Sequence, residues 1–327
     1  MRKQFVSRGL VLAAPFVFSL LSLLSCDQGD IAVDRLDAPG VRVLGVNVAQ
    51  DKPLPANEDV IVRLDHLLLP LSVSRQSVNV VDGYSELITN PIVTYRPIAR
   101  MVRIGNPFED KRAWLTDGLY FKIVLAAPRG ESTAGIRSIS NIPLDTSVPR
   151  IFGFYASPPV MNEDPPPDFC AEVWPTFRDR CVGCHNSSEK NAGLSLVVGD
   201  LPDVLGRTAR ATLRGANTNG SPLSRSFLSD TPILDPGAPG TSYLLYLLLR
   251  NADERAGDAA APEPASHCGE KRNVASPLPL LADDRAALTN SVGASPPHAG
   301  VTLRELARIE EWIERGARAR SCAACDP

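Results

Sequence analysis

The sequence predicts a chain of several domains, in which an all-β sandwich precedes an all-α C-terminal domain. Three observations carry the prediction. Short apolar runs with period-two alternation recur over residues 40–158, a Cys-x-x-Cys-His motif occupies residues 181–185, and an apolar pattern with helical spacing covers residues 303–316. The all-α class of the second domain also depends on a family resemblance described below. With 327 residues, the chain is long enough for about two domains that each bury a core.

The charge balance argues against a nucleic acid partner. The chain has 34 Lys and Arg residues against 37 Asp and Glu residues, which gives a net charge of -3. Arg2, Lys3 and Arg8 lie in a segment that we expect to be removed, so the mature chain would keep 31 basic residues against 37 acidic ones, a net charge of -6. An acidic chain has no basic field to hold a polynucleotide backbone.

The first 25 residues are typical of an export signal. Positive charges precede a charge-free apolar run from Leu10 to Leu24, which is shorter than the roughly 20 residues that span a bilayer. The run ends in Leu23-Leu24-Ser25-Cys26, which resembles the lipobox of bacterial lipoproteins. That resemblance implies that Cys26 is lipidated, becomes the first mature residue and anchors the protein to the inner or outer membrane, facing the periplasm or the cell surface. The alternative is an ordinary cysteine after a normal cleavage site.

After a linker over residues 26–39, the pattern predicts an antiparallel sandwich over residues 40–158. Val60, Val62 and Leu64 fall on one face, as a half-buried strand requires, and Asp82-Gly83 is one of several turn signals. We expect His66 to be a surface histidine without a role, because no second ligand or base stands near it. The predicted strands lie within residues 41–49, 60–64, 77–81, 92–95, 101–104 and 119–125.

Short motifs in this region resemble the bacterial Ig-like domain found in S-layer and other surface proteins. They are Pro55-Ala56-Asn57, Leu71-Ser72-Val73, Ser77-Val78-Asn79-Val80 and Asp117-Gly118-Leu119-Tyr120. The resemblance implies an Ig-like sandwich that acts as a spacer or adhesion module, and it supplies no catalytic residues.

Cys181-Val182-Gly183-Cys184-His185 matches the attachment pattern of c-type haem. Two cysteines at this spacing can hold one porphyrin through thioether bonds, and the adjacent histidine then binds the iron. We therefore expect one covalent haem c, with Cys181 and Cys184 as its attachment points and His185 as the proximal iron ligand.

The flanking sequence is similar to the cytochrome c domain of secreted, modular bacterial proteins. The similarity implies an all-α, cytochrome c-like haem domain over residues 169–327, after a linker over residues 159–168. Independently, Thr302 and Glu305 form a capping box ahead of a helix from about 303 to 316. The stretches that carry the resemblance are residues 173–181, 192–196, 235–237, 242–246 and 306–317.

The chain departs from this family at the sixth iron ligand. Where the family has Met-Pro-Pro, this sequence has Ser295-Pro296-Pro297-His298, and no methionine follows Met161. His298 is the first alternative ligand, His267 is the second, and an open or water-bound iron is the third. A pair of histidines should lower the reduction potential relative to a His/Met pair.

Four cysteines, Cys170, Cys268, Cys322 and Cys325, are not used by the lipid or the haem. In an oxidising compartment they would form two disulfides, with three possible connectivities. A zinc site built from Cys181, Cys184, Cys322 and Cys325 is the alternative, and the long separation of the two pairs argues against it. Residues 251–279, rich in Ala, Pro, Asp and Glu, are typical of an insertion loop.

Three functions fit these features. The leading hypothesis is a membrane-anchored periplasmic c-type cytochrome that exchanges electrons with redox partner proteins and has no catalytic residues. The second is a haem sensor or peroxidase-like enzyme with an open sixth position. The third is a surface or adhesion lipoprotein in which the haem module is structural.

Overall fold

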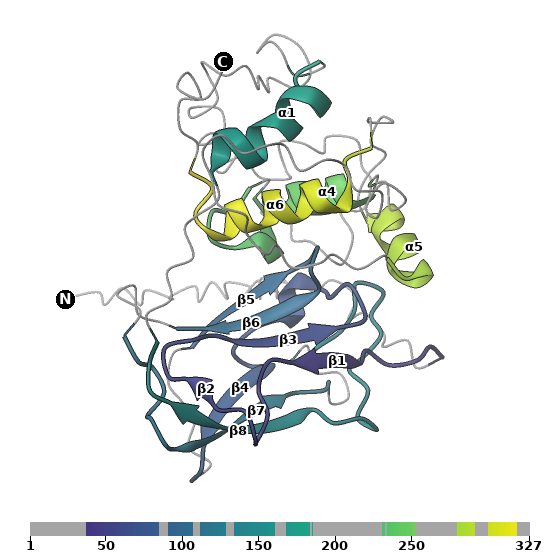
Figure 1. The fold of residues 1–327 in the computed structure, drawn as a ribbon. Helices are drawn as coiled ribbons and strands as arrows, with labels where there is room; N and C mark the ends of the chain where they lie inside the picture. Colours follow the sequence, from purple (N-terminus) through teal and green to yellow (C-terminus); the bar gives the residue numbers. More distant parts are fainter. Residues whose placement is uncertain are drawn as a thin grey trace, which may run out of the picture. The chain divides into compact units, whose positions relative to one another are not determined.

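The N-terminal half of the chain forms two four-stranded β-sheets (Figure 1). The first sheet, in a computed structural model of the chain, has the order β1-β3-β6-β5 and is antiparallel throughout. Its strands are β1 (Val43–Val46), β3 (Val60–Leu64), β6 (Met101–Gly105) and β5 (Ile92–Arg96). The structure describes residues 37–84, 91–106, 112–128, 134–160, 168–183, 185, 231–232, 234–250, 252, 280–291 and 300–318.

The second sheet has the order β2-β8-β7-β4. Its strands are β2 (Leu54–Pro55), β8 (Ile151–Ser157), β7 (Tyr120–Leu125) and β4 (Val78–Asp82). The β2 strand pairs in parallel with β8, and the other pairings are antiparallel. The sequence pattern did not predict β2 or β8, since β2 has only two residues and the alternation in β8 is interrupted by Gly153.

The predicted period-two strands of this region are confirmed. Val60, Val62 and Leu64 are fully buried, as predicted. In β7, Phe121 pairs with Phe154 of β8 and both rings are buried. Burial of large apolar side chains such as these stabilises a sandwich by about 1.5–3 kcal/mol each. The predicted strand over residues 119–125 begins one residue later, because Leu119 lies just before β7 and is 41% exposed.

The described part of the C-terminal half contains short helices. A π-helical turn, η2, leads directly into α1, and α6 begins at the predicted capping box: Thr302 Oγ1 accepts from the Glu305 N–H, and the Glu305 carboxylate accepts from the Thr302 N–H. The elements are η2 (Phe169–Val173), α1 (Trp174–Arg180), η5 (Pro239–Thr241), α4 (Tyr243–Arg250), α5 (Ala282–Ser291) and α6 (Leu303–Glu314); a further short helix, η1 (Pro70–Ser72), follows β3.

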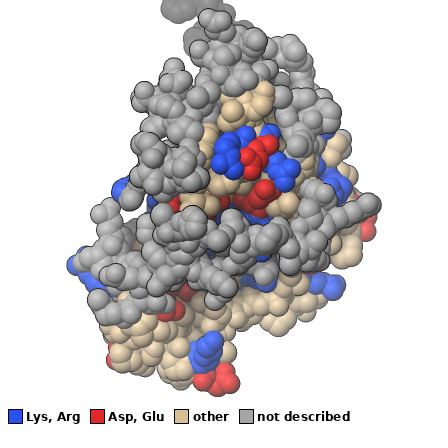
Figure 2. All heavy atoms as spheres, turned by 45° about the horizontal axis from the view of Figure 1, so that its top comes forward, with Lys and Arg blue, Asp and Glu red and all other residues tan. Residues whose placement is uncertain are grey.

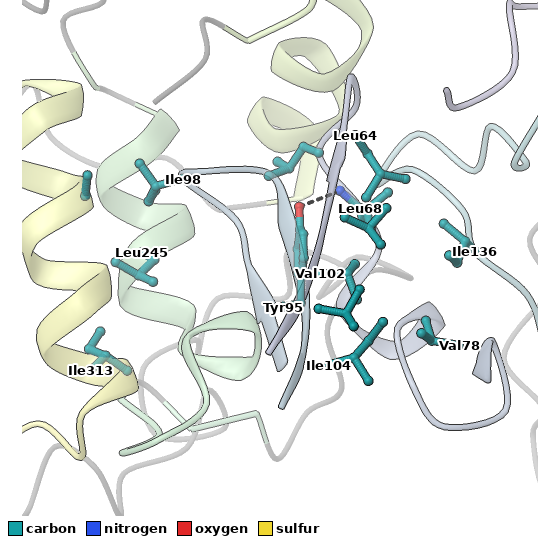
Figure 3. Close-up of a cluster of buried hydrophobic side chains, with 14 of the residues drawn as sticks. Leu64, Leu68, Val78, Tyr95, Ile98, Val102, Ile104, Ile136, Leu245 and Ile313 are labelled. Atoms are coloured by element: carbon teal, nitrogen blue, oxygen red, sulfur yellow. Dashed lines mark hydrogen bonds between the residues drawn. The ribbon is translucent and has the colours of Figure 1, made fainter. Parts of the chain in front are cut away.

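The predicted fold class is wrong in its second part, because these helices do not form a distinct all-α domain. Among the described residues, their apolar faces join the core of the sandwich. Leu245 of α4 and Ile313 of α6 belong to the same buried cluster as Ile98 and Val102 (Figure 3). A helical apolar pattern shows that a face is buried but not which surface covers it, which is why the sequence did not reveal this packing.

Edge strand β5 is the part of the sheet that η5 covers. Gly240 of η5 lies so close to Tyr95 that an added Cβ would stand 2.9 Å from the Tyr95 Cβ. Tyr95 itself accepts a hydrogen bond from the Leu68 N–H at 2.7 Å, which the dashed line in Figure 3 marks. Within the described ranges, no helix combines the length and apolar character needed to cross a membrane.

Candidate functional site

The segment that leads into the Cys-x-x-Cys-His motif is held by its own N-terminal cap. The Asp168 carboxylate accepts from the N–H groups of Cys170 and Ala171, at 2.9 and 3.3 Å, and the Glu172 carboxylate accepts from the Asp168 N–H at 3.0 Å. These contacts satisfy backbone donors that the first helical turn leaves unpaired. Helix α1 then runs up to Cys181.

Cys181 and His185 are joined by one further helical turn. The Cys181 N–H donates to the Phe177 carbonyl, and the His185 N–H donates to the Cys181 carbonyl, each at 2.9 Å. Cys181 is half-buried. The local backbone therefore holds Cys181 a single turn before His185.

An aromatic cluster packs against this segment. The Trp312 ring of α6 lies 5.3 Å from the Phe169 ring and 6.1 Å from the Phe177 ring, measured between centroids. Phe169 also lies 6.5 Å from Trp174. All four rings are buried. The motif is thus attached to a rigid, largely apolar support formed by η2, α1 and α6.

One ring nitrogen of His185 is buried and makes no hydrogen bond to the described residues. This atom, Nδ1, is inaccessible to solvent and has no hydrogen-bond partner among the described residues. The indole Nε1 of Trp174 is in the same state. A buried polar atom without a partner costs roughly 1–3 kcal/mol, so such atoms usually serve a function or a ligand.

Several predicted site residues lie outside the described residues. Of the disulfide candidates, Cys170 is described and is disulfide-bonded. Among the residues that the structure covers, no group of three or more His, Cys, Asp or Glu side chains is arranged to hold a metal ion. The residues outside the described part are Cys26, Cys184, His267, Cys268, His298, Cys322 and Cys325.

A second group of charged residues, which we call the junction network, links α6 to the first sheet. Glu310 is fully buried; its Oε1 accepts from the Ile98 N–H at 2.6 Å and its Oε2 from Arg96 Nε at 3.2 Å. The Glu314 carboxylate forms an ion pair with Arg96 Nη1 at 3.4 Å and accepts a hydrogen bond from Arg103 Nη1 at 2.8 Å. Arg103 also donates to the Asp59 carboxylate from Nε, at 2.5 Å. The junction network therefore consists of Glu310, Arg96, Glu314, Arg103 and Asp59.

Burial and neighbouring charges shift the pKa values of Glu310 and Arg96 in opposite directions. Burial raises the pKa of Glu310 to about 7, although the Arg96 charge and the Ile98 N–H lower it. Burial lowers the pKa of Arg96, but Glu310 and Glu314 outweigh it, so its pKa is raised and the guanidinium stays charged. Glu310 is thus a carboxyl group that changes its protonation near neutral pH.

Sequence reasoning missed the junction network, although one signal was available. Leu303, Leu306, Glu310 and Ile313 follow the spacing of a single helix face, so the periodicity places Glu310 among buried apolar residues. An acidic residue at such a position requires a partner. The partners, Arg96 and Arg103, are more than 200 residues away in the chain and no pattern links them to α6.

His66 is part of a second polar contact between the two halves. The prediction that His66 is a surface histidine is wrong, because the residue is only 5% exposed. Its Nδ1 lies 3.3 Å from Asp284 Oδ1 of α5, and Asp284 Oδ2 accepts from the Leu67 N–H at 2.7 Å. Burial lowers the pKa of His66, but the hydrogen bond and charge of Asp284 outweigh it, so the pKa is raised. The partner of His66, Asp284, lies 218 residues away in the chain, so the sequence around His66 does not indicate this contact.

The exposed charges beside the motif are of both signs. Arg178 pairs with Asp179 at 2.7 Å, and Arg180 of α1 lies 3.7 Å from Glu305 of α6. Figure 2 shows basic and acidic side chains intermingled on the face that it displays. Such exposed pairs contribute little to stability.

Comparison with known proteins adds little to this description. No protein-family profile matches the chain, and no curated protein matches it. Among solved structures, it is similar to the crystal structure of the S-layer protein rSbsC(31-844), with 14% sequence identity and a TM-score of 0.28. The match covers 41% of this chain and spans 17% of the length of that chain.

Proposed function

We propose that this protein is a membrane-anchored periplasmic c-type cytochrome that transfers single electrons through one covalently bound haem c. The observation that carries the proposal is the Cys-x-x-Cys-His motif at the end of α1, together with the buried and unpartnered Nδ1 of His185. A motif of this kind needs a histidine that is not committed to the protein core, and His185 meets that requirement.

Each residue of the motif has a distinct role. Cys181 and Cys184 attach the haem through thioether bonds, and His185 binds its iron. When bound, the haem supplies a one-electron couple between Fe(III) and Fe(II). The aromatic rings of Phe169, Phe177 and Trp312 provide an apolar support beside the motif, which limits the access of water. No substrate chemistry is required of the chain, and its partners are redox proteins.

The location of the protein is part of the same proposal. The apolar run before Cys26 supports export, and covalent haem attachment takes place outside the cytoplasm. A lipid on Cys26 would anchor the chain to the inner or outer membrane without a spanning segment. The electron donor and acceptor would then be proteins of the cell envelope.

A second function is favoured by one fact of the sequence. No methionine follows Met161, so the usual thioether ligand is missing after the haem motif. If neither His298 nor His267 binds the iron, the open position would take a small ligand or a peroxide.

The experiment is an absorption spectrum of the mature chain, residues 26–327, produced with haem-maturation machinery and recorded oxidised and reduced. The whole mature chain is used because Glu310 and Asp284 would lose their buried partners in a C-terminal fragment. Haem that stays attached after denaturation in the wild type, and is absent when Cys181→Ser and Cys184→Ser are combined in one chain, is the expected result. Ser147→Ala is a control that should retain haem, because Ser147 is exposed and distant in sequence from the Cys-x-x-Cys-His motif.

Matched alanine variants distinguish His298 from His267 as the sixth iron ligand. We expect low-spin haem in the wild type that becomes high-spin in His298→Ala and stays low-spin in His267→Ala. A high-spin wild type that binds carbon monoxide and is unchanged by either variant would favour the ligand-binding function instead. A chain that matures without covalent haem would overturn both.

A further inference from the structure

Helix α6 connects the haem motif to the sandwich through two opposite faces. Trp312 packs on Phe169 and Phe177 beside the motif. Glu310 points to the sheet, where it meets Ile98 and Arg96. Two residues along an α-helix are separated by about 200° of rotation, so both contacts are made at the same level of α6. A charge on Glu310 is therefore within about one helix diameter, roughly 10 Å, of the aromatic support of the motif.

The surroundings of Glu310 make its charge effective over that distance. The side chain is fully buried, and the groups around it are fixed by hydrogen bonds rather than by water. Salt screens buried charges much less than exposed ones. By contrast, Asp179 is nearer to the motif in sequence but its side chain is 57% exposed, so solvent weakens its influence.

We propose that Glu310 takes up a proton when the haem is reduced, so that electron transfer by this protein is coupled to proton uptake. The inference rests on the proposed function. In the haem-loaded protein, one electron from a redox partner would reduce the iron from Fe(III) to Fe(II), and one proton from solvent would form an O–H bond on the Glu310 carboxylate. Oxidation reverses both changes, so the charge inside the protein is the same before and after each transfer.

The groups that face Glu310 allow this exchange. Arg96 of β5 donates to it, Tyr95 of β5 and Tyr246 of α4 interact with its charge, and Glu314 of its own helix adds a second negative charge. Arg96 also pairs with Glu314, so it keeps a carboxylate partner when Glu310 is protonated. Arg103 and Asp59 complete the junction network and extend it toward partly exposed side chains. Burial holds the pKa of Glu310 at about 7, within the range where the proton can be gained or lost.

The experiment is a titration of the reduction potential against pH on the haem-loaded mature chain. We expect the wild-type potential to fall as the pH rises through about 7, because reduction then requires a proton. Glu310→Gln should lose this slope, while Asp179→Asn should keep it. In weakly buffered solution with an indicator dye, the wild type should take up protons on reduction and Glu310→Gln should take up fewer.

Each outcome bears on one of the two proposals. The absence of haem from the spectrum overturns the proposed function, and this inference with it, before any potential is measured. Haem with a potential independent of pH near neutrality, or a slope that persists in Glu310→Gln, overturns this inference and leaves the cytochrome function intact. If Glu310→Gln does not fold, infrared difference spectra of the wild type decide, because a protonated carboxyl band must appear on reduction and its absence contradicts the inference.

Discussion

The sandwich and the C-terminal helices use their polar residues in different ways. In the sandwich, most strand positions alternate between buried apolar and more exposed residues, and β-ladder hydrogen bonds pair the backbone. The helices instead bury two acidic residues, Glu310 and Asp284, each of which is completed by groups of the sandwich. The sandwich side of the contact supplies arginine, histidine and backbone N–H donors.

This difference implies an asymmetric dependence. Without the helices, Arg96 and Arg103 would become exposed to water, which solvates a guanidinium well. Without the sandwich, Glu310 and Asp284 would lose every partner described above, and the apolar faces of α4 and α6 would lose part of their cover. The sandwich is therefore closer to an independent fold than the helical part is.

The largest effect expected from this comparison is on isolated fragments. A fragment of residues 37–160 should keep β-structure and unfold cooperatively, whereas a fragment of residues 168–327 should not fold, because its buried acids have no partners. Circular dichroism and thermal unfolding of the two fragments measure this. A cooperative transition in the C-terminal fragment would contradict the asymmetry.

The next effect concerns a single ion pair of the junction network. At a pH above 7, where the Glu310 carboxylate is charged, Arg96→Met should destabilise the protein by about 3–5 kcal/mol, because the substitution leaves this charge buried without its cation. Denaturant unfolding of the mature chain measures the free energy.

Arg42→Met is the matched control for this substitution. The Arg42 Nε to Asp145 Oδ2 distance is 3.3 Å, close to the 3.2 Å between Arg96 Nε and Glu310 Oε2, but the Arg42 side chain is 55% exposed against 12% for Arg96. The control should have a much smaller effect. Equal effects would show that burial at the junction is not the determining factor.

The junction should also make stability depend on pH. The pKa of Glu310 is raised from 4.5 to about 7, so the folded protein holds this proton more tightly than the unfolded chain. The contribution of this proton to the free energy of unfolding is present in full below pH 4.5 and is lost as the pH rises to about 7, a change of order 3 kcal/mol. The pKa of His66 is also raised, so its contribution is lost as the pH rises above 6.5.

The measurement is the difference in unfolding free energy between the wild type and Glu310→Gln across this pH range. The comparison removes the contribution of all other carboxyl groups, which titrate in both proteins. The advantage of the wild type should decrease as the pH rises. A difference that increases with pH would mean that Glu310 is stabilised in its charged form by Arg96.

The smallest effect tests the contact between η5 and β5. Gly240→Ala should destabilise the protein by about 1–3 kcal/mol, because the added methyl group would stand 3.0 Å from the Tyr95 carbonyl oxygen, which is backbone and cannot rotate away. Gly45→Ala in β1 is the control, since nothing lies within 4 Å of its added Cβ. Thermal unfolding compares the two, and equal stability of both variants would exclude a close contact at η5.

Local patterns predicted what depends on neighbours in the chain. Alternation in β3 and β7 located their buried residues, and the Thr302 and Glu305 pair located the start of α6. The same patterns failed where a distant segment decides the environment. His66 was predicted to be exposed because its partner, Asp284, is separated from it by 218 residues. The Cys-x-x-Cys-His motif was recognisable from three residues, but the burial of His185 Nδ1 without a partner among the described residues depends on how the chain packs around it.

The sequence by itself determined the strands of the sandwich other than β2 and β8, the position of α6 and the Cys-x-x-Cys-His motif, since each is encoded by residues within one or two turns or one strand of each other. Only the tertiary structure decided that the helices share a core with the sandwich and that Glu310 and Asp284 meet their hydrogen-bond partners there. The physical reason is that a buried charge is tolerated only where a partner is brought to it, and folding, rather than local sequence, brings Arg96 and His66 to these acids.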